Sequence, residues 1–293
     1  MSDTAPSLLT DVPQLRIAMS AQGRALPAPD VVTQDHSADG VPLRLYRPIQ
    51  SADDARSALP LLVFLHGGGW MLGDLETHDA CCRWLCERSG CAVLGVGYRL
   101  APEHPFPAGL EDAASAWRWA LSEAAWLGCD PGRVAIGGES AGANLAAALT
   151  LKLRDGGEEQ PLFQLLVHPP SDLCLEQPSI DEVILPGLTR DFLQECVRAY
   201  LGDTSPTLPL VSPLRCPDLS GLAPAVVVTV ENDPLRDDGE HYALALARAG
   251  NAVSLQRLLG LPHGFMFLPV TDPAVSAAYD LLGARIARYF GAA

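Results

Sequence analysis

The sequence predicts an α/β fold in which a mostly parallel central sheet is flanked by helices. Its 293 residues are 48% hydrophobic, which is enough to bury one large core with an accessory segment. Short apolar runs alternate with helix-like segments along most of the chain, without an internal repeat or a low-complexity tract. The runs lack polar alternation, which is typical of strands buried on both faces. Right-handed crossovers between such strands make a sheet mostly parallel.

The predicted elements follow one another in a regular order. Residues 31–34 and 42–46 flank an Asp39-Gly40 turn and predict an antiparallel hairpin. Further strands are predicted at residues 61–65, 92–98, 133–137, 162–168, 225–230 and 253–258. Helices are predicted at residues 79–88, 110–127, 141–154, 237–249 and 274–290.

Two regions do not fit this alternation. The first thirty residues contain one helical candidate, residues 8–21, bracketed by prolines. Residues 171–213 are rich in proline and contain a helical stretch near residues 191–201. Connections of such length inside a compact domain are usually functional. We expect the two regions to cover one edge of the sheet together.

The composition narrows the classes of partner. Twenty Lys and Arg against 35 Asp and Glu give a net charge of −15, so most of the surface repels polyanions. Nucleic acid and anionic membrane are therefore poor partners. The N-terminal residues show no export signal, and the longest apolar runs fall far short of the roughly 20 residues that cross a bilayer. We expect a cytoplasmic protein without a membrane partner.

The chain has eight cysteines, of which Cys81, Cys82, Cys86 and Cys91 form the densest group. Their spacing fits neither the paired CxxC pattern of zinc sites nor the framework of a small secreted domain. We expect reduced, mostly buried thiols and no metal site.

One serine stands in a distinctive setting, the stretch VAIGGESAGAN at residues 134–144. A GxSxG turn between a strand and a helix projects the hydroxyl of Ser140 above the sheet. Gly138 and Gly142 avoid a clash where strand and helix approach each other. The helix dipole favours negative charge beside the serine. A chance match is the alternative, but the strand before the motif and the helix after it favour a nucleophile.

A serine nucleophile requires a histidine base and an orienting acid. In a strand-turn-helix setting the acid and then the histidine follow the serine along the chain. Three histidines lie downstream: His168 ends a strand, His241 lies in a helix pattern, and His263 lies in a loop after a late strand. The loop position favours His263. Asp233 follows the strand at residues 225–230, at the sheet edge where sites of open α/β sheets are built.

The motif HGGGW, residues 66–70, directly follows the strand at residues 61–65. Consecutive glycines leave backbone N–H groups unobstructed, as an oxyanion hole requires. A plain flexible loop is the alternative for three glycines. A phosphate cradle would need a longer glycine motif that does not follow here. Beside the GxSxG turn, the oxyanion hole is the better interpretation.

Together these stretches resemble the hormone-sensitive-lipase-like (bacterial family IV) carboxylesterases, which have the α/β-hydrolase fold. The matching motifs run in family order from about residue 43 onward: HGGGW, GDLETHD at 73–79, YRLAPEHPFPA at 98–108, GESAG at 138–142, DPLRDDG at 233–239 and HGF at 263–265. The family more often has Asp where Glu139 stands and Gly where Ala143 stands. Neither difference touches the triad, although both affect the shape of the pocket.

The resemblance implies a serine carboxylesterase that hydrolyses short to medium acyl esters. Ser140 would be the nucleophile, His263 the general base and acid, and Asp233 its orienting carboxylate. The oxyanion N–H groups would come from three residues, which are Gly68, Gly69 and Ala141. Within YRLAPEHPFPA, the polar residues Arg99, Glu103 and His104 are interpreted as part of a structural loop that holds the site.

The resemblance also implies a helical cap. The cap would comprise residues 1–40 and 171–213, over a catalytic domain of residues 41–170 and 214–293. The family requires no metal or organic cofactor, and by analogy we expect a small-molecule ester as substrate and a homodimer.

Two other classes of function stay open. The same triad could cleave an amide, as an arylformamidase does, or a lactone, and residue types do not separate these reactions. The plant gibberellin receptors resemble this family but bind a ligand without a complete triad. The presence of both Asp233 and His263 favours catalysis over binding alone.

Overall fold

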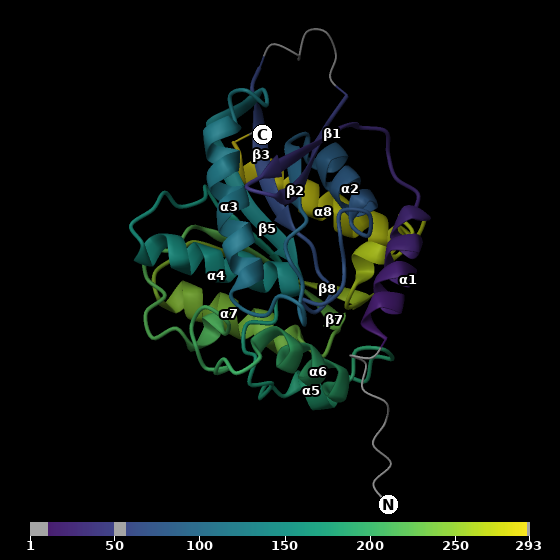
Figure 1. The fold of residues 1–293 in the computed structure, drawn as a ribbon, viewed down its shortest axis with the longest axis vertical. Coiled ribbons are helices and arrows are strands. Elements are labelled where there is room, and N and C mark those ends of the chain that lie inside the picture. The colour runs from purple at the N-terminus through teal and green to yellow at the C-terminus, as the bar shows by residue number, and fades with distance from the viewer. Residues whose placement is uncertain (1–10, 50–56, 292–293) are drawn as a thin grey trace, which may run out of the picture.

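The centre of the molecule is an eight-stranded sheet in the order β1-β2-β4-β3-β5-β6-β7-β8 (Figure 1). The computed structural model describes residues 11–49 and 57–291. The strands are β1 Val32–Ala38, β2 Val41–Arg47, β3 Leu59–Leu65, β4 Ala92–Val96, β5 Cys129–Glu139, β6 Gln164–Val167, β7 Ala225–Asn232 and β8 Val253–Pro262.

The sheet is parallel except at one edge. Strand β2 pairs antiparallel with both β1 and β4, and the predicted hairpin is confirmed because Ala38 pairs with Val41 across the turn. From β4 to β8 every pair is parallel. Val63 of β3 lies between Leu94 of β4 and Ile136 of β5, so the fully apolar strands meet in the middle of the sheet. The carboxyl ends of β5, β6, β7 and β8 therefore gather along one edge.

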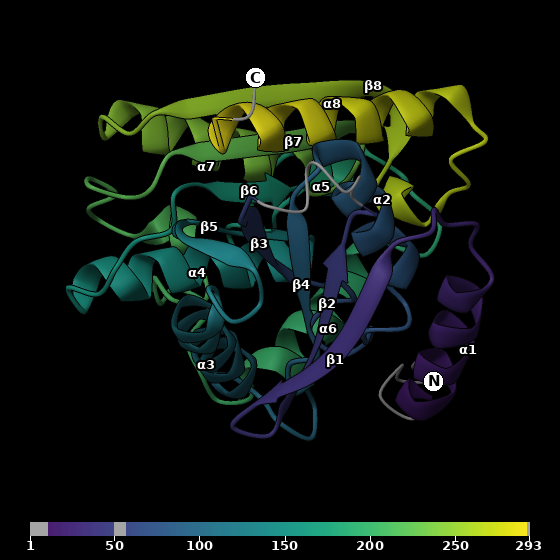
Figure 2. The ribbon, with the colours of Figure 1, turned by 90° about the horizontal axis from the view of Figure 1, so that it is seen from above.

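Helices cover both faces of the sheet. On one face lie α3 Ala108–Glu123, α4 Ala141–Asp155 and α7 Arg236–Arg248, which share a core with Val227 of β7 (Figure 1). On the other face α2 Asp79–Ser89 packs beside α8 Pro273–Tyr289, over Val226 and Val228 of the same strand (Figure 2). Successive residues of β7 thus face opposite cores, which explains why its sequence is apolar without alternation.

Some element boundaries differ from those predicted. Helix α3 ends at Glu123 rather than residue 127, because a turn that closes at Gly128, with φ 71°, redirects the chain. Strand β5 starts at Cys129, which pairs with Leu59 across an irregularity in the register. Strand β6 keeps four of the seven predicted residues.

Three helices lie outside the alternating pattern. Helix α1 spans Val12–Arg24, three residues beyond the predicted end, and predicted residues 8–10 lie outside the described residues. Helices α5 Ser179–Glu182 and α6 Arg190–Leu201 belong to the predicted cap segment 171–213. Thr189 caps α6 by accepting a hydrogen bond from the N–H of Phe192. Within the predicted segment 1–40, α1 stands beside the sheet, whereas β1 is part of it (Figures 1 and 2).

Within residues 11–49 and 57–291, no helix has the length and apolar character needed to cross a membrane.

Candidate active site

Ser140 occupies a strained turn between β5 and α4. Its φ of 52° and ψ of −121° are rare for a residue with a side chain, and such strain is characteristic of functional positions. The turn is tied to β6 by the hydrogen bond from the Ser140 N–H to the carbonyl of Val167, at 2.9 Å. A Cβ on Gly142 would lie 2.0 Å from the carbonyl oxygen of Leu65, so a glycine is required where helix and sheet meet.

His263 connects Ser140 to Asp233. Its Nε2 lies 3.0 Å from the Ser140 Oγ, and its Nδ1 lies 2.9 Å from Asp233 Oδ2. The other oxygen of Asp233 accepts the backbone N–H of Leu235 at 2.7 Å, so the fully buried carboxylate is fixed at both oxygens. This chain of contacts lets a serine hydroxyl give its proton to an imidazole whose tautomer is set by a carboxylate.

The neighbouring acids have other partners. Asp237 accepts the N–H of Ser179, and Asp238 accepts the N–H groups of Ser171 and Asp172. Both therefore hold the segment that carries α5 and α6. Glu231 accepts the N–H of Gly260 at the exposed end of β8. Among the acids of this stretch, the structure brings Asp233 to His263.

The other two downstream histidines have contacts other than Ser140 Oγ. His241 is on α7, where its Nδ1 contacts the side chain of Gln177 at 2.6 Å. His168 follows β6 directly and packs its ring against that of His263, with centroids 4.1 Å apart. The sequence analysis considered His168 only as a possible base, and it did not predict that the His168 ring would lie against His263. The signal was its position at the carboxyl end of a strand beside β5.

Backbone donors face Ser140 from the loop after β3. Among the three glycines, Gly67 directs its N–H toward the ring of His78, with 3.1 Å between its nitrogen and Nε2. The N–H groups of Gly68, Gly69 and Ala141 make no hydrogen bond to another described residue. Gly68 and Gly69 line the same pocket as Ser140, as does Ala141. The free donors thus gather around the serine, as an oxyanion hole requires.

The glycine loop is packed on both sides, and this packing favours an oxyanion hole over the alternative of a plain flexible loop. The ring of His66 stacks on Tyr98 with centroids 4.2 Å apart, and the Tyr98 hydroxyl donates to the carbonyl of His66. Trp70 stacks on Tyr200 of α6, with centroids 4.6 Å apart and the ring planes 9° from parallel. Through these stacks the loop is fixed to the segment after β4 on one side and to α6 on the other.

A second carboxylate lies beside the serine. Glu139 is buried with its Oε2 at 3.3 Å from His78 Nε2 and its Oε1 at 3.7 Å from His168 Nε2. Burial alone would raise the pKa of Glu139, but the hydrogen bond of His78 and the nearby rings of His168 and His263 lower it to about 2. Sequence reasoning gave Glu139 no role beyond pocket shape, and the partnership with His78 carried no local signal.

The carboxylates of Asp233 and Glu139 affect the pKa of His263. Burial lowers the pKa of His263, but the adjacent Asp233, with a contribution from Glu139, raises it above its ordinary value.

Nitrogen and oxygen atoms of Glu139, His168 and His263 lie within 4.8 Å of one another, a donor set that metals use elsewhere. Both nitrogens of His263 already contact Asp233 and Ser140, so a metal ion would have to displace one of them.

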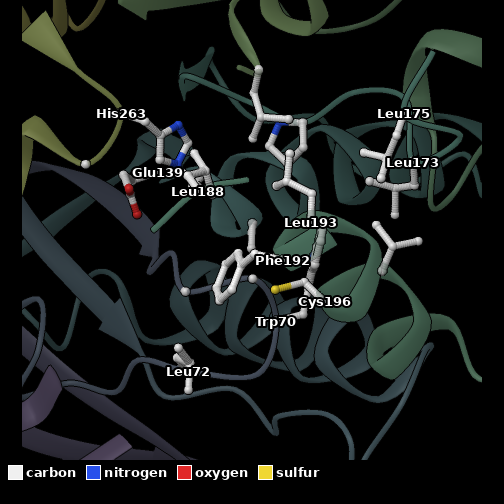
Figure 3. A pocket seen from close by; sticks show the side chains of 18 of the residues that line it. Trp70, Leu72, Glu139, Leu173, Leu175, Leu188, Phe192, Leu193, Cys196 and His263 are labelled. Carbon is white, nitrogen blue, oxygen red and sulfur yellow. Dashed lines mark hydrogen bonds between the residues drawn. The ribbon is translucent and has the colours of Figure 1, made fainter. Parts of the chain in front are cut away.

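A pocket of about 160 Å³ opens over Ser140 and His263. Its wall is mainly apolar and comes from α1, α6, the segment before α6 and the loops after β3, β7 and β8 (Figure 3). The apolar lining residues include Met19, Trp70, Leu72, Leu173, Leu175, Leu188, Phe192, Leu193, Cys196, Val197, Leu235 and Phe267. In Figure 3, Glu139 and His263 stand at one end of the pocket, and Leu173 and Leu175 at the other. Burial raises the pKa of Cys196 to about 12, so this thiol is inert.

The loop at residues 98–108 supports the site from outside. Arg99 forms a bidentate ion pair with the buried Asp112. Arg16 of α1 binds both carboxylate oxygens of Glu103, and it also donates to the carbonyls of Met71 and Ala101 at 2.8 Å. These contacts agree with the structural interpretation of Arg99 and Glu103, and Arg16 ties α1 to two loops.

Comparisons with known proteins agree with this geometry. A family model described as alpha/beta hydrolase fold matches residues 62–267. The chain is 44% identical over 275 residues to the carboxylic ester hydrolase LipN of Mycobacterium tuberculosis, covering 88% of this chain and 71% of that protein. It is 38% identical over 231 residues to an ethyl acetate hydrolase of Pseudomonas putida, covering 77% and 71%.

A solved structure, the hyperthermophilic esterase from the archaeon Pyrobaculum calidifontis, superposes with a TM-score of 0.85 at 36% identity. The match covers 95% of this chain and 93% of that one.

Proposed function

Since the chain belongs to the alpha/beta hydrolase family and is a carboxylic ester hydrolase, we propose that Ser140, His263 and Asp233 perform its reaction. The observation that carries this proposal is the unbroken contact from Ser140 Oγ through both nitrogens of His263 to Asp233 Oδ2. Each link has hydrogen-bond length, and the serine faces an apolar pocket of its own.

The reaction proceeds in two halves. In the first, Ser140 Oγ forms a bond to the acyl carbon while its proton passes to His263 Nε2. The negative charge on the former carbonyl oxygen is bound by the N–H groups of Gly68, Gly69 and Ala141. His263 then gives its proton to the departing alcohol oxygen, which leaves the acyl group on Ser140. In the second half a water molecule gives a proton to His263 Nε2 while its oxygen forms a bond to the acyl carbon. The bond from that carbon to Ser140 Oγ then breaks as Oγ takes the proton back from His263, and the acid is released.

The pocket supports esters of small acids as substrates. An apolar cavity of roughly 150 Å³ accommodates a benzene molecule, which has six carbon atoms. The cavity of about 160 Å³ over Ser140 therefore suits an acyl chain of about two to six carbons, within the short to medium range. The ethyl acetate hydrolase relative acts on an ester of this size.

Amides and lactones are the second candidates for the same chemistry. Their cleavage requires the same base to protonate a poorer or tethered leaving group. A role as a ligand receptor is disfavoured by the complete set of contacts among Ser140, His263 and Asp233.

We further propose that α1, α5 and α6, with the segments that join them to the sheet, form the cap of the pocket. Met19 of α1 and Phe192 and Cys196 of α6 line the pocket and support this assignment. All eight cysteines are free, which favours a reducing compartment such as the cytoplasm. The expected homodimer stays a prediction, which sedimentation would test.

Substitution of Ser140 by alanine tests the proposal. We expect Ser140→Ala to reduce hydrolysis of p-nitrophenyl butyrate by a factor on the order of a million, without a change in melting temperature. Ser122→Ala, on the exposed surface of α3, is the matched control and should keep wild-type activity. Retention of more than a few per cent activity in Ser140→Ala would refute the assignment. A panel of esters of graded acyl length, with one amide and one lactone, separates the two candidate functions.

A further inference from the structure

The environment of His168 is unusual for a buried histidine. Its side chain is fully buried, and neither ring nitrogen has a hydrogen-bond partner among the described residues. Buried polar atoms without partners are rare in folded proteins and call for an explanation. Its backbone has φ 37°, a left-handed conformation that costs free energy in a residue with a side chain. Both features cost stability, which suggests that the residue is retained for another reason.

The ring of His168 is placed by its neighbours against one partner, the ring of His263. The two ring centroids are 4.1 Å apart and the planes are inclined by 48°. Phe265 flanks the His168 ring with its centroid 5.9 Å away. The backbone N–H of His168 donates to the carbonyl of Val228 at 2.6 Å, which anchors the residue to β7. His168 does not line the pocket, so it contacts the base but not the substrate.

We propose that His168 is a positioning residue for the base: its ring face holds the plane of the His263 ring and supports the imidazolium that forms during the reaction. The proposal rests on the proposed function of His263. Rotation of an imidazole about its last side-chain bond is soft, because such bonds have broad torsional minima. Hydrogen bonds to Asp233 and Ser140 fix the two nitrogens, but the bond to Ser140 is broken in every cycle. The contacts with Asp233 and with His168 persist, and of these the contact with His168 acts on the ring itself.

Glu139 sets the orientation and the tautomer of His168. Its Oε1, at 3.7 Å, faces Nε2 of His168. A buried imidazole directs its N–H toward such an anion, which assigns the proton to Nε2. Burial, together with the charge of His263, lowers the pKa of His168 to about 4, so the ring is neutral when the enzyme works. A neutral aromatic face attracts a cation, and His263 becomes a cation when it takes the serine proton.

The titratable groups that face His263 come from three strands. They are Asp233 after β7, Glu139 at the end of β5 and His168 after β6. The two carboxylates favour the imidazolium by charge, and the ring of His168 favours it through its face. Loss of the ring should therefore lower the pKa of His263 and slow the chemical step, without altering the binding of substrate.

Three variants of His168 distinguish the effect of its aromatic ring from the effects of side-chain volume and of an N–H donor. His168→Phe keeps an aromatic face, His168→Leu keeps the volume without one, and His168→Gln keeps an N–H donor near Glu139. With p-nitrophenyl butyrate we expect kcat of the Phe variant within about fivefold of wild type. The Leu and Gln variants should lose about 10- to 100-fold in kcat, with KM changed less than twofold. His241→Leu, the same change on the exposed part of α7, is the control and should match wild type.

The pH dependence gives a readout that a purely structural role would not move. In His168→Leu the acidic limb of kcat/KM should shift to lower pH, because the imidazolium of His263 has lost its aromatic neighbour. Nitrogen NMR of labelled imidazole measures the pKa of His263 directly and does not depend on turnover. It therefore tests His168 even if the protein hydrolyses no ester, in which case the proposed function fails by itself.

Several results would overturn the proposal. They are wild-type kcat in the Leu variant, equal losses in the Phe and Leu variants, or an unmoved pKa of His263 in a folded Leu variant. If the Leu variant does not fold, kcat of the Phe variant is compared with kcat of the Gln variant instead. A higher kcat in the Gln variant than in the Phe variant would also overturn the proposal.

Discussion

Asp237 Oδ2 accepts the backbone N–H of Ser179 at 3.0 Å, so this carboxylate faces the segment before α6 rather than the ring of His263. Asp233, four residues earlier, contacts His263. Asp233, directly after β7, therefore orients His263, whereas Asp237, in the first turn of α7, holds the segment before α6.

The separation predicts different effects of the same substitution. Asp233→Asn should lower kcat by roughly 10³ to 10⁴ with the fold intact, because the amide no longer sets the tautomer of His263 or stabilises its cation. Asp237→Asn should cost mainly stability, about 1 kcal/mol, through a weakened bond to Ser179. Steady-state kinetics and thermal unfolding of the two variants measure these effects. A dead Asp237→Asn beside a nearly active Asp233→Asn would show that the acid is misassigned.

The pH profile follows from the raised pKa of His263. The base must be neutral to accept the serine proton, so activity should fall as the pH drops through that pKa. The acidic limb of kcat/KM should therefore have its midpoint above about 6.5, the ordinary value for imidazole. Glu139→Gln removes a negative charge near the ring, which should move the limb to lower pH. A limb that stays in place or moves upward would contradict this electrostatic account.

The size of the pocket can be altered at Phe192 of α6. Phe192→Ala removes most of a ring that faces the cavity, so the preferred acyl chain should lengthen by about two carbons. The ratio of kcat/KM for p-nitrophenyl octanoate to that for the butyrate should rise at least tenfold. Trp126→Ala, at an exposed position remote from the pocket lining, is the control and should leave the ratio unchanged. An unchanged ratio in Phe192→Ala would place the acyl group elsewhere.

The contact between helix and sheet at Gly142 should tolerate no side chain. A methyl group there would lie 2.0 Å from the carbonyl oxygen of Leu65, so Gly142→Ala must displace α4 or β3. We expect loss of activity together with a destabilisation of a few kcal/mol, seen as a lower midpoint of urea unfolding. Gly132→Ala in β5 is the control, because the nearest neighbour of an added Cβ there is a side-chain oxygen of Asp130 at 3.4 Å. Wild-type activity in Gly142→Ala would disprove the packing argument.

Sequence reasoning identified the elements that depend on local pattern. Uninterrupted apolar runs predicted the parallel strands, and the Asp39-Gly40 turn predicted the first hairpin, which the structure confirms. The α/β hydrolase fold and the ester chemistry are likewise confirmed by the comparisons. The prediction of Asp233 and His263 rested on their positions after strands, because the carboxyl ends of parallel strands meet at one edge, and the structure brings the two side chains to 2.9 Å from each other.

Side-chain contacts between residues far apart in the sequence could not be predicted from local patterns. Nothing near His168 indicates that its ring would lie against His263, because that contact depends on the register between β6 and β7. The partnership of His78 with Glu139 joins residues 61 positions apart. The end of α3 was misplaced because the helix stops at Glu123 and residues 124–128 form a turn that closes at Gly128, although the apolar residues 124–127 continue the helical pattern.

The bonds of Arg16 bear on how the protein responds to heat and salt. Helix α1 has few buried side chains and is attached to the loops at Met71, Ala101 and Glu103 chiefly through one guanidinium. Such an element can detach by local unfolding at a smaller free energy than the whole domain requires. Because the pair Arg16–Glu103 is partly exposed, salt weakens it. Amide hydrogens of α1 should therefore exchange faster than those of β5, and concentrated salt should widen that difference while the sheet stays protected.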